Sequence, residues 1–217
     1  MKKVVIFDLD GTILDTLTDL MNSVNYVLEK KGLNIKTLAE IKSYVGNGIE
    51  LLMRRALPED ISEDEFQIDF KMFRKHYEAN LQNETKPYPG IFELMVDLIN
   101  QGILLAVVSN KFQSGVEKLV KDFFGDLINL AIGTSDTIRP KPEIDSINFL
   151  YESLNIKEID KVYFVGDSEV DIQTAKNANI PVIAVSWGFR GREALEKYEP
   201  NFLVDTPREI YEIVIND

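Results

Sequence analysis

The sequence of 217 residues contains no cysteine and only one histidine, His76. The absence of cysteine excludes disulfide bonds, thiol nucleophiles and zinc sites with cysteine ligands, and a single histidine excludes metal sites built from several imidazoles. Any metal ion in this protein must therefore be held by oxygen atoms. We interpret His76 as a structural residue, because it falls within an amphipathic helical pattern away from every motif described below.

Basic residues are also in the minority: 24 lysines and arginines stand against 36 aspartates and glutamates, which gives a net charge of −12. Nucleic acids and anionic membrane surfaces attract proteins with surplus positive charge, so we expect neither as a partner. The sequence also lacks the ~18 consecutive apolar residues of a membrane-spanning helix, and its N-terminal apolar run is too short for a signal peptide. These absences favour a cytoplasmic location.

The hydrophobic segments that are present are short, rich in β-branched residues and nearly continuous, which is typical of strands covered on both faces of a parallel sheet. Helical patterns lie between them. Such alternation predicts an α/β fold with a doubly wound, mainly parallel, Rossmann-like sheet. The predicted strands are residues 3–8, 103–109, 129–132, 162–166, 182–186 and 202–204.

The helices between these strands have recognisable ends. Gly102 is expected to end the first of them, since glycine is common just after a helix. The next helix is expected to begin with a capping box in which Ser114 is the N-cap and Glu117 accepts from its backbone.

One long segment interrupts the alternation of strands and helices. Residues 15–86 show helical periodicity and no convincing strand, so we predict an all-helical insert, or cap, within an α/β core formed by residues 1–14 and 87–217. One helix of the insert begins with a capping box of Ser62 and Glu65. Open α/β sheets bind ligands outside the carboxyl ends of their strands, where this insert begins. The insert is therefore positioned to act as a lid.

A pair of aspartates, Asp8 and Asp10, lies at the end of the first predicted strand. Residues two apart in an extended chain point to the same side, so both carboxylates are expected to enter one space. The simpler interpretation is that Asp10 and Gly11 form only a turn.

A second pair of aspartates, Asp167 and Asp171, follows the strand at residues 162–166. Asp171 would lie about one helical turn beyond Asp167 on the same face. The simpler interpretation is that Asp167 or Ser168 caps a helix whose dipole Asp171 suits. That interpretation explains one acid but not two pairs at two strand ends.

Four converging carboxylates would repel one another unless a cation neutralised them. Mg²⁺ prefers oxygen ligands, keeps several waters and bridges to substrate phosphates. The sequence therefore predicts a Mg²⁺ site that handles phosphate. Because the net charge of −12 repels anions, local donors must attract the phosphate.

Three residues are candidates for those donors. Ser109 and Asn110 follow the second predicted strand and offer a hydroxyl and main-chain N–H groups. Lys141 stands between Pro140 and Pro142, which restrict the backbone that presents its ammonium. Serine at a strand end is most often a turn residue and most lysines are solvated, so each signal depends on the neighbouring acids.

The combined motifs resemble the haloacid dehalogenase superfamily of hydrolases over nearly the whole chain. The insert is similar to the small helical cap of that superfamily, and residues 44–48 resemble its phosphoglycolate phosphatase branch. The motifs occur in the order Asp8-Leu9-Asp10-Gly11-Thr12, Ser109-Asn110, Lys141-Pro142 and Gly166-Asp167-Ser168-Glu169-Val170-Asp171.

The resemblance implies a nucleophile, an acid and base, and a metal site. Asp8 would form an aspartyl phosphate, and Asp10 would protonate the leaving oxygen and then deprotonate the attacking water. The Asp8 carboxylate, the Asp10 main-chain carbonyl and Asp167 would hold Mg²⁺. Asp171 would hold waters of the metal or Lys141 from further out.

The resemblance also implies a phosphate site. Ser109 and the N–H groups of Leu9, Asp10 and Asn110 would bind the phosphoryl oxygens, and Lys141 would offset developing charge. Within the insert, Gly46, Asn47 and Arg54 are the candidates for substrate selection, although an exposed helix position is the simpler interpretation of Arg54. Arg190, after the fifth predicted strand, is a candidate to approach a substrate, although a surface role is the simpler interpretation.

The implied function is a Mg²⁺-dependent phosphatase for a small phosphorylated metabolite, with phosphoglycolate as the first substrate to test. The alternatives are β-phosphoglucomutase-like phosphoryl transfer, pyrophosphate hydrolysis, and a binding module that has lost catalysis. Asp10 argues against a dehalogenase and Thr12 favours a phosphatase over a mutase. The branch usually has a further proline two residues after the Lys-Pro motif, where this chain has Ile144. No oligomeric state is predicted.

Overall fold

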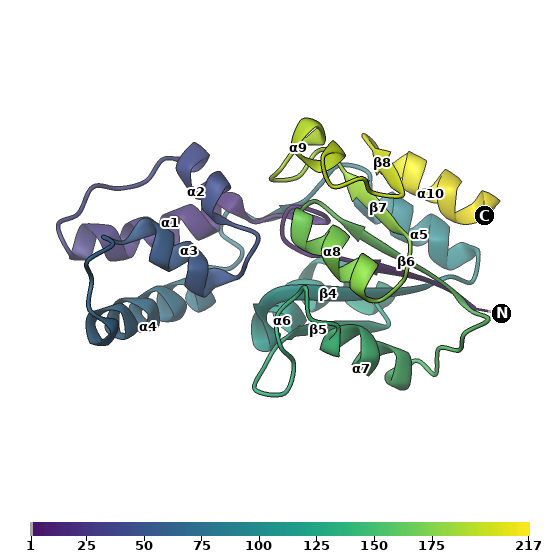
Figure 1. Cartoon of the computed structure of the whole chain (residues 1–217), viewed down its shortest axis with the longest axis horizontal. Helices are drawn as coiled ribbons and strands as arrows, with labels where there is room; N and C mark the ends of the chain where they lie inside the picture. The colour runs from purple at the N-terminus through teal and green to yellow at the C-terminus, as the bar shows by residue number, and fades with distance from the viewer. Residues whose placement is uncertain (1) are drawn as a thin grey trace.

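The computed structural model, which describes residues 2–217, contains one six-stranded sheet with the strand order β5-β4-β1-β6-β7-β8 (Figure 1). Every pair of neighbouring strands in this sheet is parallel. The six predicted strands and the fold class are thus confirmed. The strands are β1 (Lys3–Phe7), β4 (Leu104–Phe112), β5 (Leu130–Thr134), β6 (Lys161–Gly166), β7 (Val182–Val185) and β8 (Phe202–Val204).

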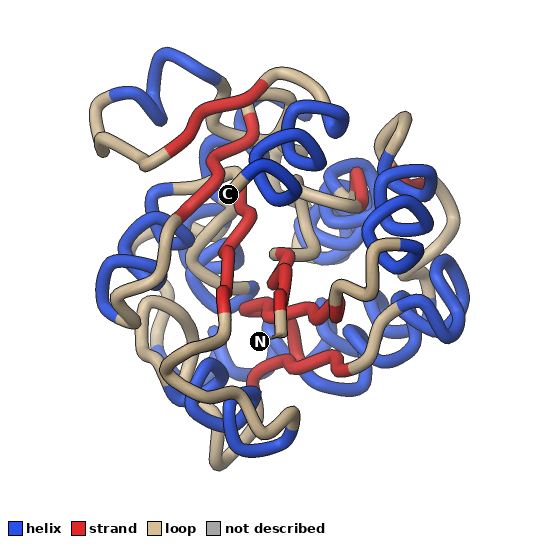
Figure 2. Tube along the Cα trace, turned by 90° about the vertical axis from the view of Figure 1, so that its right-hand side faces the viewer, coloured by secondary structure: helices blue, strands red, loops and turns tan. Residues whose placement is uncertain are grey.

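Helices cover both faces of the sheet, as the end-on view in Figure 2 shows. In β1, Val5 and Phe7 pack into one hydrophobic cluster and Val4 and Ile6 into another, and all four are fully buried. Burial on both faces is what produces the continuous apolar pattern of a parallel strand. The first cluster includes residues of α5 (Ile91–Asn100), α6 (Gln113–Phe124) and α10 (Pro207–Asn216), and the second includes residues of α7 (Asp145–Ser153), α8 (Glu169–Asn177) and α9 (Arg192–Glu196).

The start of α6 differs from the sequence-based prediction. The helix begins at Gln113 with Phe112 as its N-cap and has no side-chain cap, so the capping box of Ser114 and Glu117 is wrong. The reason is that β4 continues to Phe112 and passes directly into α6, which places Ser114 inside the first turn. Gly102, by contrast, follows the end of α5 with a φ of +74°, which favours glycine.

Four helices gather at one end of the molecule, apart from the sheet (Figure 1). They are α1 (Leu17–Lys30), α2 (Leu38–Tyr44), α3 (Ile49–Ala56) and α4 (Glu63–Ala79). The predicted capping box of Ser62 and Glu65 begins α4. Two strands were not predicted: β2 (Leu14–Asp15) and β3 (Lys86–Pro87) pair antiparallel where the chain leaves and re-enters the α/β part. Two residues are too few to leave a strand pattern in the sequence.

The chain reverses its direction of travel across the sheet at β1. After β1 the chain adds β4 and β5 on one side, and it then returns to add β6, β7 and β8 on the other. Ligands of such sheets bind outside the carboxyl ends of the strands at this reversal. The carboxyl ends of β1, β4 and β6 therefore mark the place to look for a site. No helix within residues 2–217 is long and apolar enough to span a membrane.

Candidate active site

Three aspartates from two strand ends form a buried cluster of carboxylates. Oxygen atoms of Asp8, Asp167 and Asp171 all lie within 4.8 Å of one another. Asp8 follows β1, and its N–H donates to the carbonyl of Val165 in β6 at 2.8 Å, which fixes the end of β1 beside the second acidic motif. Residues 159 positions apart in sequence are thus joined by strand pairing rather than by a local turn.

Asp10 does not belong to this cluster, which differs from the prediction that four carboxylates converge. The chain is no longer extended after Asp8, because Gly11 has a φ of +93° and its N–H donates to the carbonyl of Leu14. The rule that residues two apart point to the same side fails in such a turn. Asp10 still lines the same pocket as Asp8, but its carboxylate has other partners.

Two loops close tightly around Asp167. The N–H of Phe189 donates to Asp167 Oδ2 at 2.6 Å, and the hydroxyl of Thr12 lies 3.3 Å from Oδ1. A Cβ atom at Gly11 would lie 2.4 Å from Asp167 Oδ2, and one at Gly188 would lie 2.3 Å from Asp167 Cβ. Such distances are far inside van der Waals contact, so both loops need glycine to approach this carboxylate.

Lys141 supplies positive charge to the cluster. Its Nζ lies 2.8 Å from Asp8 Oδ1 and 2.6 Å from Asp171 Oδ1. Although burial alone would lower the pKa of Lys141, Asp171 and Asp8 raise it above its ordinary value. The ammonium therefore stays charged and holds two of the three carboxylates. Within residues 2–217 no lysine or arginine pairs with Asp167.

The cluster carries more negative than positive charge. Burial raises the pKa of Asp8 to about 7, against the opposing effect of Lys141. Burial and the neighbouring Asp8 and Asp171 also raise the pKa of Asp167 well above its usual range. Raised pKa values mean that the protein alone stabilises these charges poorly. Hard oxygen donors that lack compensating charge suit a hard divalent cation, so the residues present fit such an ion.

Asp171 both belongs to the carboxylate cluster and takes part in the cap of a helix, so both interpretations of the second acidic pair apply to it. Ser168 is the N-cap of α8, and its N–H and hydroxyl donate to Asp171 Oδ2 at 3.1 and 2.6 Å. The other oxygen, Oδ1, accepts from Lys141. Asp171 is fully buried and both of its oxygens have donors. Its place in the cluster is therefore to fix Lys141 and the start of α8.

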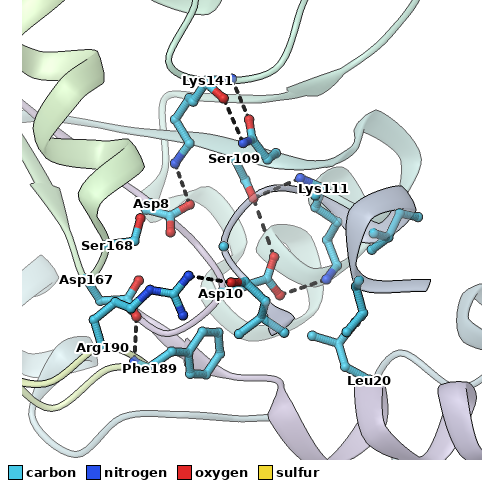
Figure 3. A pocket seen from close by; sticks show the side chains of 16 residues that line it. Asp8, Asp10, Leu20, Ser109, Lys111, Lys141, Asp167, Ser168, Phe189 and Arg190 are labelled. Atoms are coloured by element: carbon cyan, nitrogen blue, oxygen red, sulfur yellow. Dashed lines mark hydrogen bonds and ion pairs between the residues drawn. The ribbon is translucent and has the colours of Figure 1, made fainter. Parts of the chain in front are cut away.

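The carboxylate of Asp10 is held mainly through one oxygen. Thr16 Oγ1 and Lys111 Nζ donate to Oδ1 at 2.6 and 2.7 Å, whereas Ser109 Oγ lies 3.4 Å from Oδ2 (Figure 3). Lys111 was not among the site residues predicted from the sequence. A signal was present, because Lys111 lies two residues after Ser109 in β4 and residues at this spacing share one side of a strand.

The side chain of Asn110, near the end of β4, makes two hydrogen bonds to the main chain of Lys141. Its amide donates to the carbonyl of Lys141 at 3.1 Å, and its Oδ1 accepts from the Lys141 N–H at 2.5 Å. These two bonds fasten the loop that presents Lys141 to the end of β4. Leu9 is fully buried, and its carbonyl accepts from the N–H groups of Ile13 and Leu14.

A cavity of about 60 Å³ lies between the ends of these strands and helices α1 and α3 (Figure 3). Its polar wall comes from the α/β part of the chain and includes all the acids except Asp171. Its apolar wall comes largely from the helices. The polar wall includes Asp8, Asp10, Ser109, Lys111, Lys141 and Asp167, and the apolar wall includes Leu20, Val45, Ile49 and Leu52.

The predicted selectivity residues are placed differently from one another. Gly46 lines the pocket, but among residues 2–217 the lining includes neither Asn47 nor Arg54. Asn47 Oδ1 accepts from Arg55, and the guanidinium of Arg54 pairs with Glu50 and lies over the ring of Phe66 at 3.7 Å. Local partners within the helices thus draw both side chains away from the cavity.

Arg190 lines the pocket instead of taking the surface role of the simpler interpretation. Its Nε pairs with Glu169 at 2.8 Å, and its Nη2 donates to the carbonyl of Val45 at 2.6 Å. Gly46 has a φ of +110°, and a Cβ there would lie 2.7 Å from Arg190 Nη2. Gly46 therefore admits this guanidinium. No local sequence signal connects Arg190 with Val45, which is 145 residues away.

Comparison with known proteins gives consistent matches over the whole chain. The sequence model of haloacid dehalogenase-like hydrolases matches residues 5–185. The phosphoglycolate phosphatase of Mesorhizobium japonicum is 33% identical over 211 residues, which cover 94% of this chain and 90% of that protein. That of Aquifex aeolicus is 31% identical over 225 residues, with 99% and 97% covered. A crystal structure from Lactobacillus delbrueckii subsp. bulgaricus, provisionally named a phosphoglycolate phosphatase, superposes with a TM-score of 0.93 at 36% identity and 99% coverage of both chains.

Proposed function

Because this chain belongs to the haloacid dehalogenase-like hydrolases, we propose that it is a Mg²⁺-dependent phosphatase that hydrolyses small phosphate monoesters through an aspartyl phosphate. The observation that carries this proposal is the arrangement of Asp8, which lies at the pocket, pairs with Lys141 and adjoins the carboxylate of Asp167. The names of the relatives make phosphoglycolate the first substrate to test.

In the first half of the reaction, Asp8 is the nucleophile. A carboxylate oxygen of Asp8 attacks phosphorus, the bond from phosphorus to the ester oxygen breaks, and that oxygen takes a proton from Asp10. Lys141 is bonded to the Asp8 carboxylate and lies where negative charge gathers during the transfer. Lys141 therefore lowers the energy of the charged transition state and keeps Asp8 in position.

In the second half of the reaction, water attacks the phosphorus of the aspartyl phosphate. Its proton passes to Asp10, the bond from phosphorus to the Asp8 oxygen breaks, and inorganic phosphate leaves with the Asp8 carboxylate restored. Asp10 lines the pocket within the same turn as Asp8, so one carboxyl group can serve both halves.

The Asp8 carboxylate, the Asp10 main-chain carbonyl and Asp167 would hold Mg²⁺. When bound, this ion supplies positive charge that attracts the phosphate and offsets the charge of the transition state. Asp171 acts from further out by fixing Lys141. The charge of the buried cluster supports this assignment, because three carboxylates face a single ammonium.

The phosphoryl oxygens are assigned to the hydroxyl of Ser109 and to the main-chain N–H groups of Leu9, Asp10 and Asn110. Ser109 lines the pocket beside Asp10, and Asn110 ties this strand end to Lys141. Because the strand end holds these donors in place, they need little reorganisation when charge develops on the substrate.

We assign residues 15–86 to a cap and residues 1–14 and 87–217 to the catalytic core. The antiparallel pair β2–β3 lies at the junction, which supports a boundary there. The cap covers the pocket with apolar side chains and limits the access of bulk water to it, while one water must still reach the aspartyl phosphate. A cavity of about 60 Å³ favours a small metabolite, and a large ester would require the cap to open.

The experiment that tests this function measures inorganic phosphate released from phosphoglycolate, p-nitrophenyl phosphate, sugar phosphates and pyrophosphate, with Mg²⁺ or with EDTA. We expect Mg²⁺-dependent release that is abolished in Asp8→Asn. Interconversion of sugar phosphates without net release would indicate a mutase. A folded protein that releases phosphate from no substrate would refute the proposal.

A further inference from the structure

Lys111 is a buried cation that the mechanism above does not use. Its side chain is only 2% exposed, and a buried ammonium is costly unless it is paired. Two partners are present, the carboxylate of Asp10 at 2.7 Å and the hydroxyl of Tyr77. Although burial opposes the charge, Asp10 raises the pKa of Lys111 above its ordinary value. Lys111 therefore stands as a charged group in direct contact with the acid and base.

The contacts of Lys111 determine which oxygen of Asp10 faces the substrate. Lys111 and Thr16 both donate to Oδ1, so two bonds restrict rotation of the carboxylate. Among residues 2–217 the one further bond to this carboxylate comes from Ser109, is long at 3.4 Å and reaches Oδ2 (Figure 3). Oδ2 is thus the oxygen that is free to exchange protons on the side of the phosphate site.

The position of Lys111 in turn depends on α4, within the proposed cap. Tyr77 is fully buried, and its ring stacks on Phe73 of the same helix with 5.6 Å between centroids. Its edge meets the ring of Phe112 in β4 at 6.3 Å. These contacts position the tyrosine hydroxyl so that it accepts a hydrogen bond from Lys111 Nζ. Docking of the cap and orientation of Asp10 are therefore linked through one ammonium.

We propose that Lys111, fixed by Tyr77, is a positioning residue that holds Asp10 as the base for hydrolysis of the aspartyl phosphate. In this step Asp10 Oδ2 takes a proton from the attacking water while the bond between phosphorus and the Asp8 oxygen breaks. The bonds from Lys111 and Thr16 to Oδ1 fix the carboxylate so that Oδ2 is directed toward the water. This inference rests on the proposed function and adds that the intermediate is hydrolysed when the cap is docked.

The test uses Lys111→Met and Tyr77→Phe with p-nitrophenyl phosphate and Mg²⁺. The p-nitrophenolate leaves without protonation, so formation of the intermediate needs little help from Asp10. We expect kcat to fall by about 10- to 100-fold in Lys111→Met and less in Tyr77→Phe. We expect kcat/KM to stay unchanged, because this ratio reports only the steps up to release of p-nitrophenolate. KM is therefore expected to fall by the same factor as kcat.

A second readout detects the intermediate itself. Rapid mixing of either variant with p-nitrophenyl phosphate is expected to give a burst of about one p-nitrophenolate per active site. Acid quenching is expected to recover phosphate bound to the protein. Matched controls are Lys31→Met, which removes a lysine paired with buried Asp69, and Tyr163→Phe, which removes a buried tyrosine hydroxyl on β6. Neither control contacts the pocket, and neither is expected to accumulate phosphoenzyme.

Other roles of Lys111 give different results. Direct binding of the substrate by Lys111 would raise KM and lower kcat/KM without a burst, and a purely structural role would lower kcat and kcat/KM together. Either result overturns the inference. If Lys111→Met does not fold, Tyr77→Phe, which loses one hydroxyl, must still show the burst. A folded wild-type protein that releases phosphate from none of the substrates named under the proposed function refutes that function, whereas hydrolysis without these effects refutes only the role of Lys111.

Discussion

Replacing Asp8 with asparagine is expected to abolish turnover and also to stabilise the metal-free protein. The side chain of Asp8 is buried, and burial together with Asp171 and Asp10 opposes its ionisation more strongly than Lys141 favours it. Asparagine keeps nearly the same shape without the charge. The proposed nucleophile is therefore expected to lower the stability of the fold when no cation is bound.

The size of this effect follows from the pKa of Asp8, which the folded protein raises from 3.8 to about 7. A carboxyl group with a raised pKa supports folding fully below its unfolded value, and that support is lost as the pH rises through its folded value. At ~1.4 kcal/mol per pKa unit, the titration of Asp8 lowers the free energy of unfolding by about 4 kcal/mol at pH 8 and by about 2 kcal/mol at pH 5, where the group is ionised only in the unfolded protein.

The assay is urea unfolding of wild type and Asp8→Asn in EDTA at pH 5 and pH 8. The substitution is expected to raise the free energy of unfolding, and the gain is expected to grow by about 2 kcal/mol between the two pH values. The control is Asp69→Asn, which breaks the ion pair with Lys31 and is expected to lower stability. An Asp8→Asn protein that is no more stable than wild type at pH 8 would refute the reasoning.

Three further substitutions test other parts of the site. Asp10→Asn is expected to lower kcat/KM by about 100-fold for alkyl phosphates and much less for p-nitrophenyl phosphate, and equal losses would contradict its role as an acid. Asp167→Asn is expected to remove the rise in melting temperature that Mg²⁺ gives the wild type in a thermal-shift titration, and an unchanged rise would place the ion elsewhere. Gly188→Ala is expected to cost about 1–3 kcal/mol in urea unfolding and to lower activity, because its Cβ would lie 2.3 Å from Asp167 Cβ.

The sequence was informative wherever a signal was local and repeated. Strands buried on both faces, such as β1, β6 and β7, have continuous apolar runs, and all six strands of the sheet were predicted. Parallel strands bring their carboxyl ends to one edge, so the meeting of Asp8 with Asp167 followed once the strands were known. The pairing of β1 with β6 provides that meeting directly.

Contacts that depend on turns or on distant partners were not predictable. The orientation of Asp10 depends on the turn at Gly11 and on Lys111, which is 101 residues away. Arg190 reaches the pocket because Gly46 leaves room for its guanidinium. The spacing of Lys111 from Ser109 in β4 places both on one side of that strand, but no local signal shows that Lys111 pairs with Asp10 or that Arg190 bonds to Val45. Both contacts lie where the helices meet the sheet, and the relative placement of two packed parts is not encoded in any single segment.

The point at which the helical segment enters the chain explains why its docking and the chemistry are linked. The chain leaves β1, forms the turn that carries Asp10, and reaches Thr16 just before α1, so the first residues of the exit already bond to the Asp10 carboxylate. The last helix before the return, α4, contributes Tyr77 to Lys111, the second donor to the same oxygen. Asp10 is therefore oriented by both ends of the helical segment, by Thr16 just before α1 and by Tyr77 in α4, which acts through Lys111. A rigid displacement of these helices that left the sheet unchanged would remove the contacts of Thr16 and Tyr77 that orient the Asp10 carboxylate. It would leave Asp8, Lys141 and Asp167 in place, since those three are held by the sheet and its own loops.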